Sequence, residues 1–244
     1  MAENRASAKE ETYPEGVPCW VDAELPDVEA GKRFYGELFG WEFEEAHGSS
    51  VWALLDGDRV ASLAPKSDGR MPTVWTVSFA TADVRALGRR ITEAGGQLVM
   101  APFPVGDLGT AALAADPEGA VFALWQPGTH SGFGRRREPN TFVWAELYTR
   151  DTDAANTFYG DLFHEALFGA GTEPDFGRAD VTEVFPAEMP PHFLVHFRAA
   201  ALDDALDAVR RLGGRVQKPP FSASYGRVAV VTDNQGASFA LLER

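Results

Sequence analysis

A seven-residue segment occurs twice in this 244-residue chain, and it decides the fold. Phe34-Tyr-Gly-Glu-Leu-Phe-Gly40 returns 124 positions later as Phe158-Tyr-Gly-Asp-Leu-Phe-His164. A constant order of repeated segments with slightly drifting offsets indicates two tandem copies of one domain, since the period is too long for a solenoid. Further pairs keep that order at offsets of 118 and 117: Gly95-Gly96 with Gly213-Gly214, Pro102-Phe103 with Pro220-Phe221, and Asp116 with Asp233.

Each copy is predicted to hold the same succession of elements twice. Residues 17–25 mix β-branched, aromatic and polar side chains as a strand does, and Asp27 can cap a helix whose apolar residues recur every four positions. The pattern restarts with a strand at 73–80 and a helix capped by Asp83. The chain is therefore predicted to be an α+β protein of four βαβββ units. The remaining strands of the first copy are expected near 41–46, 51–56, 59–64, 97–100, 109–115 and 120–125.

Composition divides the chain into four segments. Residues 1–16 are polar and aperiodic, which is typical of a mobile tail. Residues 127–139 are rich in Gly, Pro and Arg and are expected to form a solvated interdomain linker. Its run of three arginines, Arg135–Arg137, is interpreted as part of that linker rather than as a nucleic-acid patch. The two domains are then expected at 17–126 and 140–244.

Charge and composition exclude several classes of protein. The chain has 22 basic and 36 acidic residues, a formal net charge of −14 and a pI of about 4.7, which argues against nucleic acid or an anionic membrane as partner. The hydrophobic fraction of 45% is too high for a disordered acidic protein. A single cysteine, Cys19, leaves no internal disulfide. Without a long apolar run or a leader-like start, we expect a cytoplasmic protein.

The repeated motifs resemble those of a known superfamily. The segments LPDVEAGKRFYGELFGWEFE at 25–44 and RDTDAANTFYGDLFHEAL at 150–167, with the turn DPEG at 116–119, are similar to the vicinal oxygen chelate superfamily of glyoxalases, bleomycin-resistance proteins and extradiol dioxygenases. The resemblance implies two tandem glyoxalase-like domains. In each, two βαβββ units would curl into a partly open barrel around a cavity.

The resemblance also implies positions for metal ligands, which are His, Glu or Gln in the superfamily's enzymes. These positions fall seven residues before a helix-opening Asp and seven after the turn Asp, and Leu194 is assigned as the repeat partner of Thr76 at an offset of 118. Indole, hydroxyl and methyl side chains in this pattern do not form a site for Zn, Fe, Ni or Mn. We therefore expect no metal and no cofactor. The residues at the implied positions are Trp20, Thr76 and Ala123 in the first copy, and Trp144, Leu194 and Ala240 in the second.

The histidines provide no independent metal site. His192 and His196 have the spacing of a helical ligand pair, but they lie in an apolar run that is typical of a strand. On a strand, four residues span about 13 Å, which is too far for one metal ion. If the segment were helical, the pair would become a candidate ligand pair.

Alternation along the strands predicts which side chains line the cavities. Residues two and four positions from an implied ligand position share its face. Aromatic walls with a few carboxylates suit a small, flat, partly apolar molecule. The same aromatic side chains could instead fill a closed cavity, and the carboxylates could face solvent. The predicted ligand-binding residues are Trp20, Asp22, Glu24, Thr76, Ser78, Trp125, Trp144, Glu146, Tyr148 and His196, and no catalytic or metal residue is predicted.

Three functions remain open. The first is metal-free binding of a small, flat, neutral or cationic organic molecule, for sequestration or carriage. The second is a metal-independent isomerase, lyase or hydrolase that uses the cavity carboxylates and His196. The third is an interaction scaffold with vestigial cavities. We favour the first, with unequal sites in the two copies. We also expect a monomer in which the copies pack as an intrachain pseudo-dimer.

Overall fold

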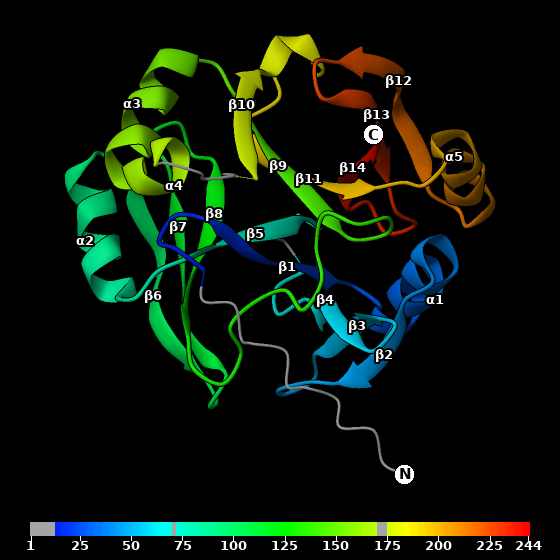
Figure 1. Cartoon of the computed structure of the whole chain (residues 1–244), viewed down its shortest axis with the longest axis horizontal. Coiled ribbons are helices and arrows are strands. Elements are labelled where there is room, and N and C mark those ends of the chain that lie inside the picture. The colour runs from blue at the N-terminus through cyan, green and yellow to red at the C-terminus, as the bar shows by residue number, and fades with distance from the viewer. Residues whose placement is uncertain (1–12, 70–71, 170–174) are drawn as a thin grey trace.

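The first copy forms one eight-stranded sheet, and the second forms one of six strands (Figure 1). The computed structural model describes residues 13–69, 72–169 and 175–244. The predicted tail therefore lies outside the described residues, apart from 13–16. In these ranges no helix is long and apolar enough to cross a membrane.

The first copy follows the predicted element order closely. Its sheet runs β2-β3-β4-β1-β5-β8-β7-β6, so β1 and β5 lie antiparallel at the centre and each unit's hairpins extend outward. The helices α1 and α2 begin after Asp27 and Asp83, whose carboxylates accept hydrogen bonds from the first-turn amides as predicted. The elements are β1 (Pro18–Leu25), α1 (Val28–Phe39), β2 (Glu42–Glu45), β3 (Val51–Leu55), β4 (Asp58–Pro65), β5 (Trp75–Ala80), α2 (Val84–Glu93), β6 (Gln97–Val105), β7 (Gly109–Ala115) and β8 (Val121–Pro127).

The second copy keeps the fold with a shorter first unit. Its sheet runs β10-β9-β11-β14-β13-β12. In the described part of that unit, only two strands pair, where the sequence predicts four. The chain at 181–189 contains Pro186 and lies over the sheet instead of pairing with it. The elements are β9 (Phe142–Thr149), α3 (Thr152–Leu162), α4 (His164–Phe168), β10 (Phe176–Asp180), the 3-10 turn η1 (Val181–Glu183), β11 (His192–Arg198), α5 (Leu202–Arg211), β12 (Arg215–Ala223), β13 (Gly226–Thr232) and β14 (Ser238–Glu243).

The two copies pack through their repeated motifs. Tyr35 of α1 donates a hydrogen bond to Asp233 in the last turn of the other copy, at 2.8 Å, and Tyr159 of α3 donates to Asp116 at 3.1 Å. The Asp233 turn makes a further contact, since the Gln235 side chain bonds both the amide and the carbonyl of Asp27. Figure 1 shows the result, with α1 beside α5 and α2 beside α3.

The main core lies between the two sheets and these helices. Phe79 of β5 lies 5.3 Å from Phe176 and 5.6 Å from Phe193 between ring centroids, and Phe39 lies 5.1 Å from Phe197. All of these rings are buried. Aromatic pairs at such distances contribute about 0.5–1.5 kcal/mol each beyond their buried area. Since each pair joins one copy to the other, the copies share one hydrophobic core.

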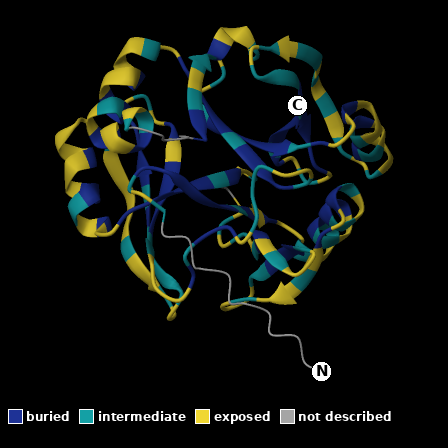
Figure 2. Cartoon of the chain, viewed as in Figure 1, coloured by how far each residue is buried: buried dark blue, intermediate teal, exposed yellow. Residues whose placement is uncertain are grey.

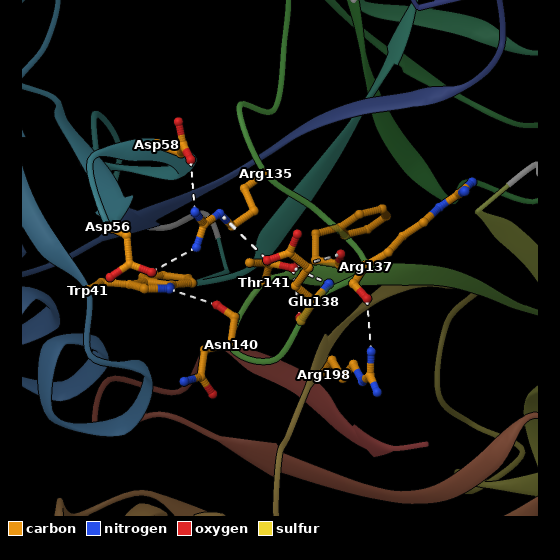
Figure 3. Close-up of polar contacts among 10 residues, drawn as sticks. Trp41, Asp56, Asp58, Arg135, Arg137, Glu138, Asn140, Thr141 and Arg198 are labelled. Atoms are coloured by element: carbon orange, nitrogen blue, oxygen red, sulfur yellow. Dashed lines mark hydrogen bonds and ion pairs between the residues drawn. The ribbon is translucent and has the colours of Figure 1, made fainter. Parts of the chain in front are cut away.

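The segment 127–139 packs against the protein instead of forming the predicted solvated linker. Phe133 is buried and stacks on Phe142, with 4.9 Å between ring centroids. Arg135 forms ion pairs with Asp56 and Asp58 of the β3–β4 turn (Figure 3). The Phe133 ring therefore contacts the second copy, while the ion pairs of Arg135 hold the segment on the first.

The end of this segment is bound to both copies. The indole of Trp41 donates to the Asn140 carbonyl at 2.8 Å, and Arg198 donates to the Arg137 carbonyl at 3.2 Å (Figure 3). The guanidinium groups of Arg136 and Arg137 both pair with the buried carboxylate of Asp175. The basic run is therefore used for internal ion pairs.

The outer strands β6 and β12 each carry two prolines, of which Pro102 and Pro220 are repeat partners. Pro102 and Pro104 lie in β6, and Pro219 and Pro220 lie in β12. Each strand is the last of its sheet. A proline has no amide hydrogen to donate, so these positions can occur only where no neighbouring strand needs one.

Candidate functional site

The first sheet presents a continuous polar and aromatic face that we call the Asp22 face. It consists of the side chains of Trp20, Asp22 and Glu24 on β1 and those of their cross-strand neighbours. Register places Ser78 and then Ala123 beside Trp20, and places Thr76 beside Asp22. The structure therefore brings together all the ligand-binding residues predicted in the first copy, since Trp125 follows two positions after Ala123 on β8.

The aromatic end of the Asp22 face is filled by protein. Trp20 packs edge-on against Trp52, with ring centroids 5.4 Å apart, and its indole nitrogen donates to the Ser62 hydroxyl at 2.9 Å. The indole of Trp125 donates to the His130 carbonyl at 2.9 Å. Trp20, Trp125 and Ser78 are buried. In this conformation the two predicted tryptophans serve as packing groups.

The acidic end of the face is more open. Asp22 and Thr76 are half-buried, and Glu24 is exposed. Loss of solvent around Asp22 raises the pKa of its carboxyl to about 7, with a smaller contribution from the negative charge of Glu24. A carboxyl with that pKa exists in both protonation states near neutrality, so it can donate or accept a hydrogen bond there.

Apolar side chains that the sequence analysis did not select complete this face. Met100, Phe103 and Val121 are 46%, 37% and 45% exposed. Pairing places Met100 across from Leu113 and Phe103 across from Ala111, in the same rows as Ala123 and Trp125. Figure 2 shows β6 as a largely exposed strand, in contrast to the buried β9, β11 and β14 of the second sheet. The predicted strand at 97–100 stopped short of Phe103, which is why this residue was missed.

The equivalent face of the second copy is covered. Tyr148 and Leu194 belong to a separate buried cluster there. The cover comes from the segment 181–189 and from Phe221 and Tyr225. Phe221 is the repeat partner of Phe103; it packs against this buried cluster, whereas Phe103 is exposed.

Glu146 forms a small hydrogen-bonded group within this cover. Its carboxylate accepts from the Trp144 indole at 2.7 Å and from the Tyr225 hydroxyl at 3.1 Å. Burial raises the pKa of Glu146, and the two hydrogen bonds oppose that shift. The structure therefore brings Trp144 and Glu146 together, but their polar atoms are satisfied within the protein.

His196 lies on the same face of β11, which is a strand as predicted. It is fully buried, and burial lowers the pKa of its imidazole to about 4. Its Nδ1 lies 3.1 Å from the Leu194 carbonyl, whereas Nε2 has no partner. Within the ranges that the structure describes, the only other buried side-chain nitrogen or oxygen in that position is Nε2 of His130.

Sequence and structural comparisons identify the superfamily. The model of the Glyoxalase/Bleomycin resistance protein/Dioxygenase superfamily matches residues 23–124. "Putative glyoxylase CFP32" of Mycobacterium tuberculosis is 34% identical over 254 residues, which cover 96% of this chain and 97% of that protein. The chain belongs to this superfamily. "Anthracycline biosynthesis protein DnrV" of Streptomyces peucetius is a further relative, 33% identical over 95% of this chain and 94% of its own length.

Solved structures of the superfamily share the fold over nearly the whole chain. The Mn(II)-bound glyoxalase from Novosphingobium aromaticivorans superposes with a TM-score of 0.62 at 15% identity, covering 94% of this chain and 82% of that one. A homoprotocatechuate 2,3-dioxygenase variant from B. fuscum gives 0.67 at 15% identity, covering 96% and 72%. These likenesses confirm two glyoxalase-like domains in tandem and extend no further than the fold.

The side chains at the superfamily's metal positions do not fit a divalent metal. Trp20, Ala123 and Thr76 lie near one another on the Asp22 face, and among these three side chains the single oxygen donor is the Thr76 hydroxyl. The indole nitrogen of Trp20 is a hydrogen-bond donor already directed at Ser62. Among the described residues, no three His, Cys, Asp or Glu side chains are grouped to hold a metal ion.

Proposed function

We propose that the chain binds a small, flat, neutral or cationic organic molecule on the Asp22 face of the first copy, without a metal. The observation that supports this most is the difference between the copies. In the second copy the segment 181–189 packs against this face of the sheet, whereas in the first copy Phe103, Met100 and Val121 are exposed on the same face as Asp22. Exposed apolar groups gathered beside a partly desolvated polar group are typical of a ligand site.

The polar groups on the face determine the charge of the ligand. Glu24 is exposed on it, and Asp22 is partly ionised at neutral pH. An anionic ligand would be repelled by both carboxylates, more strongly than in water because the surroundings have a lower dielectric constant. A neutral or cationic molecule with a hydrogen-bond donor would instead be oriented by Asp22.

A thermal-shift screen of flat aromatic compounds, followed by calorimetry on each hit, tests this proposal. Loss of the Phe103 ring removes roughly 40 Å² of apolar contact, about 1 kcal/mol or fivefold in affinity. Phe103→Ala should therefore weaken binding about fivefold. Phe168→Ala is the matched control, because Phe168 is an exposed phenylalanine of α4 outside this face. Equal loss in both variants, or in neither, contradicts the proposed site.

A second function is supported by the pKa of Asp22. A carboxyl that titrates near pH 7 can act as a general base or acid in a metal-independent isomerase, lyase or hydrolase. In this case Asp22 moves the proton, and burial with the nearby charge of Glu24 keeps its pKa high. Incubation of each bound compound with the protein, monitored by NMR, tests for conversion. If the unmodified chain converts the compound and Asp22→Asn binds it without converting it, the result supports the enzyme function. If the unmodified chain binds the compound without converting it, the result supports the binding function.

The second copy fits the scaffold alternative better than a second ligand site. Trp144, Glu146, Tyr148 and His196 lie under the segment 181–189 and Tyr225. We propose that this face stabilises the fold and that the two copies are unequal. Trp144→Ala should then lower stability without changing ligand affinity. If Trp144→Ala lowers ligand affinity as well as stability, the ligand binds in the second copy.

A further inference from the structure

An imidazole from the segment between the copies is enclosed by three indoles. The ring centroid of His130 lies 4.4 Å from that of Trp20, 4.7 Å from that of Trp52 and 5.8 Å from that of Trp125. His130 is only 5% exposed. We call these three indoles the tryptophan cage.

The walls of the cage are positioned by the sheet. Trp20, Trp52 and Trp125 come from β1, β3 and β8, whose ladders fix their backbones. The guanidinium of Arg59 lies 4.6 Å from the Trp52 ring centroid. The indoles therefore form a preformed aromatic enclosure with a positive charge at one wall.

His130 is poorly suited as a permanent core residue. Its Nε2 has no hydrogen-bond partner, and burial together with the charge of Arg59 lowers the pKa of the imidazole to about 4. A buried polar atom without a partner is destabilising, whereas an apolar ring of the same size would fill the space without that cost. Such atoms in native proteins call for an explanation.

The attachment of His130 allows the imidazole to leave without dismantling the connection between the copies. Around the residue, Gly128 and His130 each donate a backbone hydrogen bond to the Leu108 carbonyl, at 2.8 and 3.1 Å. The later anchors are separate, because Gly134 donates to the Arg59 carbonyl and Arg135 pairs with the β3–β4 turn. Withdrawal of the segment around His130 therefore breaks the bonds to Leu108 and the bond from the Trp125 indole to the His130 carbonyl, while the later anchors remain.

We propose that the tryptophan cage is a binding site for a flat, uncharged nitrogen heterocycle, and that His130 occupies it in the resting chain as an internal competitor. The enclosed imidazole shows the size and chemistry that the cage accepts. Indole faces attract cations in general, but Arg59 at the wall opposes a second positive charge, so a neutral ring is preferred. The proposal does not require that a ligand bind beside Asp22.

Titration of the full chain with benzimidazole at pH 8, followed by tryptophan fluorescence and calorimetry, tests the competition. Apparent affinity equals the intrinsic affinity reduced by the open fraction. If the imidazole fills the cage at least nine-tenths of the time, His130→Ala should bind benzimidazole about tenfold or more tightly than the unmodified chain. Equal affinity in the two proteins, or binding by neither, overturns the proposal.

Two controls separate the cage from a simple void. Phe133→Ala removes a larger ring on the same segment, 5.4 Å from Trp20, without vacating the cage. Its affinity for benzimidazole should match that of the unmodified chain, and tight binding by this variant would show that any void suffices. His164→Ala, at an exposed histidine, should also change nothing.

Hydrogen exchange on the unmodified chain tests the same proposal if His130→Ala does not fold. Saturating benzimidazole should accelerate exchange of the His130 amide several-fold, since its bond to Leu108 is lost when the segment withdraws. The Phe133 amide, bonded to the Cys19 carbonyl, should keep its rate. No acceleration at His130 overturns the proposal. Because neither measurement uses Asp22 or Phe103, failure here is distinct from failure of the site proposed above.

Discussion

Tyr35 in the first copy donates its hydroxyl hydrogen to Asp233 in the second across 2.8 Å. The repeat partners Tyr159 and Asp116 form the reciprocal bond at 3.1 Å. Each aspartate also accepts two backbone amides of its own turn through its other oxygen. The helix tyrosine of each copy is thus bonded to the turn aspartate of the other copy. This reciprocal contact explains why both the helix motif and the turn motif occur in each copy.

Tyr35→Phe should destabilise the chain by about 1.5–3 kcal/mol, the usual range for a hydrogen bond to a charged group. The hydroxyl is lost both as donor to Asp233 and as acceptor for the Trp75 indole. Tyr159→Phe should cost less, because its hydroxyl bonds Asp116 without a second partner of that kind. Urea unfolding of the variants measures this, with Thr157→Ala on the exposed face of α3 as control. A shift no greater than that of the control would contradict the proposed stabilising role.

Asp22 should make stability fall as pH rises from about 4 to about 7. Its pKa is near 7 in the folded state, against an ordinary value of 3.8, so the folded state holds the proton more tightly. The stabilisation is fully present below the unfolded pKa and is lost as the pH rises through the folded one. The slope is at most about 1.4 kcal/mol per pH unit, and solvent around the half-buried carboxyl reduces it. Asp22→Asn removes this dependence and should be more stable than the unmodified chain at pH 8.

Urea unfolding at pH 4, 6 and 8 provides the measurement. The two proteins should converge at pH 4 and differ most at pH 8. Glu42→Gln, on the exposed β2 strand, is the control for the loss of one negative charge. Parallel stability profiles for Asp22→Asn and the unmodified chain would show that this carboxyl titrates normally.

Asp175→Asn should destabilise the chain by about 2–4 kcal/mol, because two guanidinium groups lose a buried partner. Asp175 is 5% exposed, pairs with Arg136 and Arg137, and has a φ of 53°, which asparagine also tolerates. Asp56→Asn is the matched control, since its pair with Arg135 is exposed and worth less than about 1 kcal/mol. Thermal unfolding of both variants should separate them by several degrees. Similar losses would mean that burial of Asp175 adds nothing.

The separated copies should not fold alone. Residues 1–139 and 140–244 would each expose the aromatic groups that now pair across the copies, such as Phe79 with Phe193 and Phe39 with Phe197. Near-ultraviolet circular dichroism of each piece should show little fixed tertiary structure, and mixing should restore it. A cooperative thermal transition in either piece by itself would show that the copies are independent.

Repeats and helix caps were sufficient to predict the tandem organisation and most of the element order. Asp27 and Asp83 cap helices where the periodic pattern begins, and the offsets between copies located the second sheet. A helix cap is a local signal, and a repeat is found by comparing one segment with another, so both can be identified from the sequence alone. The sequence predicts four strands in the third unit, and the structure has two. Residues 181–189 are apolar enough for a strand, and only their packing over the sheet shows that they form a cover.

Much of the candidate site could not be predicted for a similar reason. Strand alternation placed Trp20, Asp22 and Thr76 on one face correctly. It could not show that His130, from a segment that looks like a linker, lies against Trp20. The exposure of Met100 and Phe103 likewise depends on whether a distant segment packs over them, and the local sequence pattern does not predict this.

The prolines of β6 and β12 have a consequence for self-association. An open sheet edge offers amides and carbonyls on which another chain can add a strand and so begin an aggregate. Pro102 and Pro104 interrupt that row in β6, beside the exposed apolar face, and Pro219 and Pro220 do so in β12. At these two edges, the chain can therefore expose apolar side chains while offering no unbroken row of amides and carbonyls on which another molecule could add a strand.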